Sequence, residues 1–295
     1  LDAEFDFKDR GGYLREGLCP ACGKKELWAY AENPRVVYCG RLNKCGYSAH
    51  VRDLFDDMFK SWSEHYPQTE TTPNAAADAY LSDGRGFDLA PLQGHYSQET
   101  FRKGDLITAT VRFQITNTIH WERLIDRPER FGKDKARVSL GAKIAGHWWI
   151  YPKLDLTAAS VVWITEGIFD AIALNQNGIN AVSCISSNFY PELALNQLKA
   201  DCQAQSKPLP KLVWAFDNDD AGHKGILKNH QRAQADGWDS SAAMPPASHV
   251  KPLDWNELHE RDQLNPDQLK KYQHYGQLLI APSASEAGLL IYHFN

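Results

Sequence analysis

The sequence predicts a chain of mixed α/β and α+β class, in which a small β unit precedes a larger core built on a mainly parallel sheet. The first fifty residues contain a cluster of cysteines: Cys19, Cys22, Cys39 and Cys45. Residues 75 to 156 combine a helix with short strands, whereas from residue 160 apolar strands alternate with helical segments. This β/α alternation is typical of a parallel sheet covered by helices, with a functional site at the carboxyl ends of its strands.

The composition is that of an ordinary globular protein, with 43% hydrophobic and 23% charged residues in a chain of 295. This length predicts two or three compact units. No run of about 18 uncharged apolar residues occurs, so we expect no membrane span. The acidic start of the chain does not resemble a signal peptide, and the cysteine spacing favours a metal site over disulfides. Both observations predict a cytoplasmic protein.

The charge distribution is uneven along the chain. Residues 101–143 hold ten Lys/Arg and five Asp/Glu, a net charge of +5. Since the whole chain carries −5, the remainder carries about −10. The net charge argues against a general nucleic-acid coat, but residues 101–143 could form a basic surface that binds nucleic acid. A solvated charged face is the alternative.

The first unit, residues 1–62, is predicted to hold strands at 27–30 and 36–38 and a helix from 50 to 60. Two residues separate Cys19 from Cys22, and Gly23 follows, which is typical of a zinc knuckle. Five residues separate Cys39 from Cys45, a wider spacing than usual, so His50 remains an alternative fourth ligand. We predict one structural Zn²⁺ that folds this unit; because such a site is closed, its role is recognition and not catalysis.

Aromatic residues accompany the cysteines in this zinc-ribbon unit. They are Trp28, Tyr30, Tyr38 and Tyr47. They either stack on unpaired bases, as in single-strand binding proteins, or form the small core of the unit.

The next segments are predicted to be a linker at 63–74 and a mixed unit at 75–156. The linker contains two prolines and several threonines. The mixed unit is predicted to have a helix at 75–81, a turn at Gly84-Arg85-Gly86 and a strand at 108–115.

The unit at 157–265 alternates strands and helices. We predict strands at 161–165, 181–185 and 212–216, and helices at 168–177 and 191–203. Residues 266–295 form a tail, in which the apolar run 288–292 could be a strand at the start of a further domain.

Acidic residues follow the strands of this unit. Glu166 ends the first strand, Asp217 and Asp219 end the third, and Asp254 follows a short strand expected near residue 250. Carboxylates held together repel one another unless a cation intervenes, and Mg²⁺ binds a few carboxylates together with substrate phosphates. A pair of such ions can promote phosphoryl transfer. We expect Asp220, in contrast, to cap the helix that it opens.

These segments resemble a known family. Residues 164–171 and 215–222 resemble the glutamate and DxD motifs of the TOPRIM domain. With an amino-terminal zinc ribbon, the order is similar to DnaG-like primases and the primase halves of phage primase–helicases. Residues 80–86, 111–115 and 121–123 resemble parts of the primase core, and the whole resemblance covers about residues 15 to 265.

The resemblance implies a site as well as a fold. Residues 75–156 would be the amino-terminal subdomain of the RNA polymerase core and 157–265 the TOPRIM domain. Glu166, Asp217 and Asp219 would be catalytic and, with Asp170 and Asp254, would bind one to three Mg²⁺ or Mn²⁺ ions. The implied template- and nucleotide-binding residues are Arg112, Arg123, Lys133, Lys135, Arg137 and Lys143.

The function that the resemblance implies is that of a DNA primase, a nucleotidyltransferase that makes short RNA primers on single-stranded DNA. Its partners would be the template, ribonucleoside triphosphates and a replicative helicase, in cis or in trans, in the replication of a bacterium, phage or mobile element. One alternative is a TOPRIM nuclease or topoisomerase, which would nick DNA without nucleotides. The other is a non-catalytic module that binds single-stranded DNA or loads a helicase without any synthesis.

Overall fold

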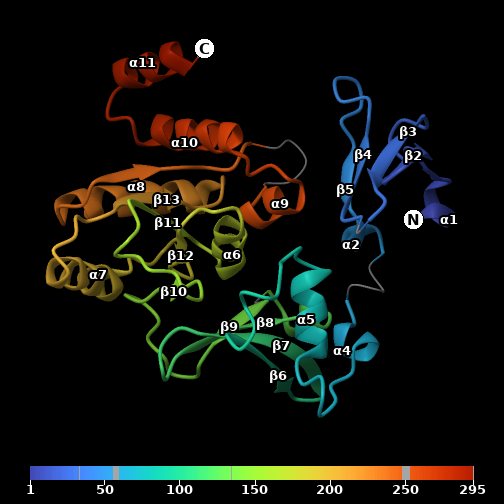
Figure 1. The fold of residues 1–295 in the computed structure, drawn as a ribbon, viewed down its shortest axis with the longest axis horizontal. Coiled ribbons are helices and arrows are strands. Elements are labelled where there is room, and N and C mark those ends of the chain that lie inside the picture. Colours follow the sequence, from blue (N-terminus) through green and yellow to red (C-terminus); the bar gives the residue numbers. More distant parts are fainter. Residues whose placement is uncertain (33, 56–59, 134, 248–252, 295) are drawn as a thin grey trace. The chain divides into compact units, whose positions relative to one another are not determined.

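The computed structural model describes residues 1–32, 34–55, 60–133, 135–247 and 253–294, which fall into two compact units (Figure 1). The first unit comprises Leu1–Leu89, Ser97–Arg112 and Glu122–Arg137. The second comprises Ala90–Tyr96, Phe113–Trp121 and Val138–Asn295. The mixed α/β and α+β class predicted from the sequence is confirmed. Within the described residues, no helix is both long and apolar enough to cross a membrane.

The chain begins with an antiparallel five-stranded sheet. Its strands, in spatial as in chain order, are β1 (Lys8–Asp9), β2 (Tyr13–Leu18), β3 (Lys25–Tyr30), β4 (Val36–Cys39) and β5 (Ser48–His50). Leu27 and Ala29 are buried, whereas the alternate residues Trp28 and Tyr30 lie on the other face. Helix α1 (Asp2–Phe5) precedes the sheet and α2 (Val51–Leu54) follows it. The helix predicted for 50–60 begins as expected, but α2 ends at Leu54 and Phe55 lies outside it; residues 56–59 lie outside the described part.

Two arginines of this sheet region contact the end of helix α5 (Ala75–Ser82). Arg52 donates to the Gly84 carbonyl oxygen at 2.7 Å, and Arg35 donates to the Ser82 carbonyl oxygen at 3.3 Å. The Ser82 carbonyl also accepts the Gly86 amide at 2.9 Å, so Arg35 adds a second donor to it, and both arginines tie the sheet region to the turn that ends α5. The first unit also contains α4 (Trp62–His65), and no helix or strand lies in the described residues 66–74 of the predicted linker.

A second sheet has the order β6-β7-β8-β9. Its strands are β6 (Tyr96–Lys103), β7 (Leu106–Gln114), β8 (His120–Leu124) and β9 (Ala136–Val138), and a 3₁₀ helix, η1 (Pro128–Phe131), precedes β9. The predicted helix at 75–81 and strand at 108–115 correspond to α5 and β7.

The third sheet has the order β10-β12-β11-β13-β14. Its strands are β10 (Trp149–Ile150), β11 (Val161–Thr165), β12 (Ala181–Ser183), β13 (Lys211–Ala215) and β14 (Ser240–Ala242). All neighbouring strands are parallel except β10, which runs antiparallel to β12. The prediction of a mainly parallel sheet is confirmed. Short, polar β14 is not among the strands predicted from the sequence.

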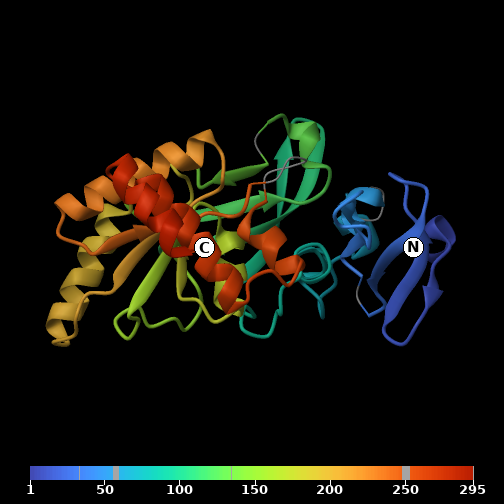
Figure 2. The same cartoon turned by 90° about the horizontal axis from the view of Figure 1, so that it is seen from above.

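Helices cover both faces of this sheet (Figure 2). They are α6 (Ile168–Gln176), α7 (Glu192–Ala204), α8 (Asp220–Ala235) and α9 (Trp255–Glu260). Ile164 and Trp214 share a buried core with side chains of α7 and α8. Since side chains alternate along a strand, Trp163 faces the other way, and its ring lies 5.5 Å from that of Trp255 in α9.

The chain ends in two helices, α10 (Pro266–Ile280) and α11 (Ala284–Phe294). Helix α10 passes so close to β14 that a Cβ on Gly276 would lie 2.3 Å from the Ala242 carbonyl carbon. The suggested strand at 288–292 is wrong, because these residues belong to α11. A short apolar run does not distinguish a strand from a helix, and here Ser283 Oγ accepts the Glu286 amide and begins a helix.

Candidate functional site

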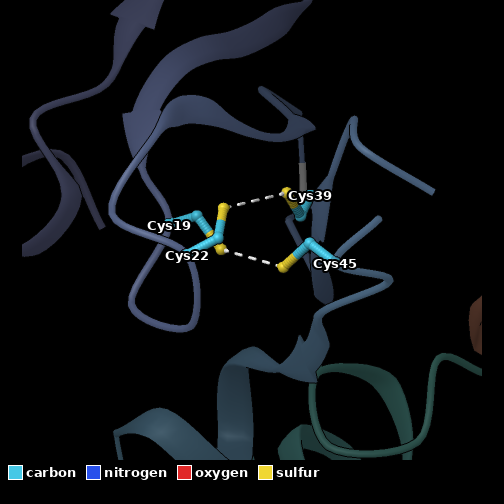
Figure 3. Close-up of side chains that lie close together, drawn as sticks. All are labelled: Cys19, Cys22, Cys39 and Cys45. Carbon is cyan, nitrogen blue, oxygen red and sulfur yellow. Dashed lines mark hydrogen bonds between the residues drawn. The ribbon is translucent and has the colours of Figure 1, made fainter. Parts of the chain in front are cut away.

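Four sulfur atoms meet at one end of the first sheet (Figure 3). Cys19 Sγ lies 3.8 Å from Cys45 Sγ, Cys22 Sγ lies 3.9 Å from Cys39 Sγ, and all four lie within 4.8 Å of one another. Four sulfurs placed tetrahedrally at a Zn–S distance of about 2.3 Å would lie about 3.8 Å apart. The four cysteines therefore fit one zinc ion. His50 is buried in β5 and is not a member of this group.

The loops at residues 19–23 and 39–45 show how both cysteine spacings bring the sulfur atoms together. Gly23 takes a φ of +64° and its amide donates to the Cys19 carbonyl, which closes the first knuckle. In the wider second loop, the amides of Lys44 and Cys45 both donate to the Arg41 carbonyl. This helical turn takes up the additional residues and returns Cys45 to the group.

The thiols differ in how readily they ionise. A hydrogen bond from the Lys24 amide lowers the pKa of Cys22 to about 7, whereas burial raises the pKa of Cys39 to about 12. Zinc binds thiolates, so binding must displace the Cys39 proton.

The second candidate site lies at the carboxyl edge of the parallel sheet. Strands β11 and β13 are neighbours in which Thr165 pairs with Ala215. Glu166 follows β11 directly, and Asp217 comes two residues after β13. The ladder of the two central strands therefore brings these carboxylates to the same edge, as the sequence predicted.

Asp217 is a strongly perturbed carboxyl group at this edge. Its Oδ1 is buried and has no hydrogen-bond partner within the described part of the chain. Burial raises the pKa of Asp217 to about 8, and the negative charges of Asp254, Glu166, Asp219 and Glu257 add to this effect. A buried carboxylate oxygen without a donor, surrounded by like charges, fits a divalent cation.

Asp219 and Asp254 begin helices that point their amino ends at this edge. Asp219 Oδ1 accepts the Gly222 amide at 2.7 Å at the start of α8, and Asp254 Oδ1 accepts the Glu257 amide at 2.6 Å at the start of α9. The helix cap expected of Asp220 therefore belongs to Asp219. The turn requires glycine at 222, because a Cβ there would lie 2.0 Å from the Asp217 carbonyl oxygen.

The acidic site is less tightly gathered than the cysteines. Of the described residues, only the cysteines form a group of three or more Cys, His, Asp or Glu with all ligand atoms within 4.8 Å. Mg²⁺ commonly takes one or two carboxylates and completes its shell with water and phosphate. The arrangement fits that mode of binding and not a closed cage of protein ligands.

Two further acidic residues lie near this edge. Asp170, a predicted metal ligand, is buried and its Oδ1 accepts the Asn256 amide at 3.2 Å, so it joins α6 to α9. Glu257 is 2% exposed, and its charge acts on Asp217. The sequence analysis did not assign Glu257, because nothing in its spacing distinguishes it from an ordinary helical glutamate.

The basic residues predicted to bind template and nucleotides fall into two groups. Arg112 forms ion pairs with Glu122 at 2.5 Å and Glu99 at 3.3 Å, and Arg137 lies 3.7 Å from Glu122. Buried Glu122 thus joins the two arginines across β7, β8 and β9, a role that the sequence analysis missed.

The other basic residues have different surroundings. Lys133, Lys135 and Lys143 are exposed. Arg123 acts on Tyr80. Burial alone would raise the pKa of Tyr80, but the charges of Arg85 and Arg123 lower it. Lys143 belongs to the second unit, whereas the other five predicted residues belong to the first.

Comparison with known proteins finds a family match for the part of the chain that contains the acidic site. Residues 163–259 match the family model described as Toprim-like. No curated protein matches the chain by sequence.

Two solved structures of a primase domain have a similar fold. The RNA polymerase domain of the Mycobacterium tuberculosis primase DnaG has a TM-score of 0.52 and 16% identity, over 81% of this chain and 88% of that one. The same domain in complex with a double-stranded DNA oligomer with a 6-nucleotide overhang has a TM-score of 0.50 and 16% identity, over 80% and 86%. The chain thus has a Toprim-like domain within a fold shared with the DnaG RNA polymerase domain, which confirms the predicted fold.

Proposed function

We propose that this protein is a DNA primase, which copies single-stranded DNA into short RNA primers. The observation that carries the proposal is the Asp217 carboxylate, whose buried Oδ1 has no partner among the described residues, at the edge of a Toprim-like sheet. The primase-like fold of the surrounding chain supports the same reaction class.

The reaction joins two nucleotides. The 3′-hydroxyl oxygen of one nucleotide attacks the α-phosphate of the next, a P–O bond forms, and the bond to pyrophosphate breaks. Bound Mg²⁺ would supply orientation of the phosphates and charge stabilisation in the transition state. Asp217, Asp219 and Asp254 would hold the ion through carboxylate oxygens. Glu166, whose pKa is raised by burial, would share in metal binding or accept the hydroxyl proton.

The zinc ribbon offers a surface for the template. Tyr13, Trp28, Tyr30 and Tyr38 contact one another on the face of the sheet opposite its core, and the Trp28 and Tyr38 rings stack 4.8 Å apart. Tyr30 is 42% exposed. Unpaired bases stack on such rings with little sequence preference. Tyr47, in contrast, packs against the ribbon core, so we assign it a structural role.

The basic residues complete the proposed interface. We assign contacts with template and nucleotide phosphates to Lys133, Lys135 and Lys143, because they are exposed. Arg112 and Arg137 would contribute as a pair whose guanidinium groups are held by Glu122. A replicative helicase remains the expected partner of such an enzyme.

The test is primer synthesis from labelled ribonucleotides on templates of varied sequence, with Mg²⁺. Asp217→Asn and Asp219→Asn should each lower synthesis at least about 100-fold, because they remove a charge from the metal site. Asparagine caps helices as well as aspartate does, so Asp219→Asn preserves the start of α8. Asp220→Asn, at an exposed position beside the cap, is the matched control and should retain full activity.

Three results would contradict the proposal. Undiminished synthesis by Asp217→Asn would remove the acidic site from the mechanism. Nicking of DNA without nucleotides, and without synthesis, would indicate a Toprim nuclease. Binding of single-stranded DNA with no Mg²⁺-dependent synthesis on any template would indicate a non-catalytic module.

A further inference from the structure

Asn218 lies between Asp217 and Asp219 in the chain, and its side-chain amide is hydrogen-bonded at both ends. Its Nδ2 donates to the Pro245 carbonyl oxygen at 2.9 Å, and its Oδ1 lies 2.6 Å from His223 Nε2. A carbonyl oxygen can only accept, so the amide nitrogen must face Pro245 and the amide oxygen must face His223. His223 Nε2 is therefore the donor of the second bond.

The Pro245 carbonyl is a fixed anchor for this amide. Pro245 is buried and follows β14, and the two residues before it are each bonded to a different element. The Ala243 amide donates to β13 at the Trp214 carbonyl oxygen, 3.0 Å away. The Met244 amide donates to α10 at the Tyr272 carbonyl oxygen, 2.9 Å away. The segment that accepts the bond is thus held from two sides.

The histidine at the other end of the amide belongs to the first turn of α8. The His223 amide donates to the Asp219 carbonyl oxygen at 2.9 Å, and Asp219 Oδ1 accepts the Gly222 amide at 2.7 Å. This turn is tightly packed, since a Cβ on Gly222 would lie 2.0 Å from the Asp217 carbonyl oxygen. Asn218 therefore joins the start of α8 to the segment after β14.

The aspartates next to Asn218 have few bonds of their own. Asp217 Oδ1 is buried without a hydrogen-bond partner, and Asp219 Oδ1 accepts one amide, within the part of the chain that the structure describes. Their remaining oxygen atoms can therefore bind a cation, while the backbone that carries them is held by Asn218. The amide restricts where both carboxylates point and occupies neither of them.

We propose that Asn218 is a positioning residue, which holds Asp217 and Asp219 in place for divalent-metal binding, and that His223 is the donor that orients it. The metal-binding part of this inference stands on the geometry of the site, and only its effect on synthesis rests on the proposed function. Side chains that orient metal ligands are typically worth about 10–100-fold in metal affinity or activity.

The direct test is Mn²⁺ binding by the full chain with its zinc, followed by electron paramagnetic resonance at a temperature where every variant is folded. Asp217→Asn should remove the binding, which identifies the ion as the one at the acidic edge. Asn218→Ala removes both bonds and should weaken binding at least about tenfold. His223→Leu removes the donor and should weaken it about tenfold. His223→Gln offers an amide N–H in place of Nε2 and should stay within about threefold of wild type.

A double variant tests whether the two residues act through one bond. Because His223 is proposed to act only through Asn218, adding His223→Leu to Asn218→Ala should change Mn²⁺ affinity by less than about twofold. Arg232→Ala is the matched control, since it removes a 2.6 Å ion pair with Glu192 near the other end of α8. It should leave Mn²⁺ affinity unchanged.

The melting temperature without Mn²⁺ separates positioning from general stability. Asn218→Ala and Arg232→Ala both remove contacts of α8 and should both lower it, but only Asn218→Ala should lower Mn²⁺ affinity. The inference is overturned if Asn218→Ala binds as tightly as wild type, if Arg232→Ala weakens binding equally, or if wild type binds no Mn²⁺ that Asp217→Asn removes. An Asn218→Ala variant that does not fold leaves the comparison of His223→Leu with His223→Gln decisive.

Primer synthesis by the same variants distinguishes this inference from the proposed function. If wild type makes no primers yet Asn218→Ala weakens Mn²⁺ binding, the primase proposal fails and the positioning role stands. If wild type makes primers and Asn218→Ala leaves Mn²⁺ binding unchanged, the primase proposal stands and the positioning role fails.

Discussion

Replacing Asp217 by asparagine should make stability less dependent on pH. Burial and neighbouring carboxylates raise the pKa of Asp217 to about 8 in the folded protein, whereas an unfolded aspartate has a pKa of about 3.9. Between these values the folded state retains a proton that the unfolded state has released. Stability from this group is therefore fully present below about pH 4 and is lost as pH rises through about 8. Asparagine does not ionise, so the variant avoids this loss.

The size of the effect follows from the same shift. Each pKa unit corresponds to about 1.4 kcal/mol, so a shift from 3.8 to about 8 sets an upper limit of about 6 kcal/mol. Because solvent screening and relaxation of the site reduce this limit, we expect about 2 kcal/mol for the substitution. In a unit of 150–250 residues this corresponds to about 4–8 °C in melting temperature.

Differential scanning calorimetry at about pH 5.5 and about pH 8 measures this difference. The buffer should contain neither Mg²⁺ nor a chelator, so that the acidic site is free and zinc is retained. Wild type should lose more stability than Asp217→Asn at the higher pH, and Asp220→Asn should behave as wild type. Added Mg²⁺ should stabilise wild type at about pH 8 but not Asp217→Asn. Equal losses in wild type and Asp217→Asn would refute the assignment of a raised pKa to this side chain.

Other predictions concern the zinc ribbon and the turn after Asp217. Cys39→Ser should abolish zinc binding and unfold the first sheet, as measured by metal content and circular dichroism; a zinc-loaded, folded variant would contradict the four-cysteine site. Gly222→Ala places a Cβ 2.0 Å from a backbone oxygen and should lower the free energy of unfolding by about 2–4 kcal/mol, whereas Gly288→Ala in the open interior of α11 should not destabilise. Trp28→Ala should weaken binding of a fluorescent single-stranded oligonucleotide by about 1–3 kcal/mol, with Tyr47→Phe unchanged; an equal loss in both variants would indicate damage to the ribbon core instead.

The two central strands of the parallel sheet were predictable because their signals are local. Strand β11 matches the predicted 161–165, and β13 differs from the predicted 212–216 by one residue at each end. Both are apolar runs that end in acidic residues. Strand β14 gives no such signal, since Ser240-Ser241-Ala242 is short and polar. It is buried through a distant contact, the close passage of α10 at Gly276.

The candidate site was predictable only in part, for a related reason. Glu166 and Asp217 follow neighbouring strands, and residues that follow parallel strands lie together at the carboxyl edge of the sheet. The effect of the Glu257 charge on Asp217 depends on how α9 folds back on the sheet. The pairing of Arg112 with Glu122 likewise depends on strand register, which residue types alone do not specify.

Trp255 gives the site an optical reporter of its own. Its indole Nε1 donates to the Ala215 carbonyl oxygen at 2.8 Å, two residues before Asp217, and the ring is fully buried against Trp163. Binding of an ion or a nucleotide at the acidic edge that shifts α9 would change the polarity around this indole and hence its fluorescence emission. The difference between the spectra of wild type and Trp255→Phe would isolate that signal from the other eight tryptophans, since the chain has nine. Ion and nucleotide titrations could then be followed by fluorescence without attaching a dye.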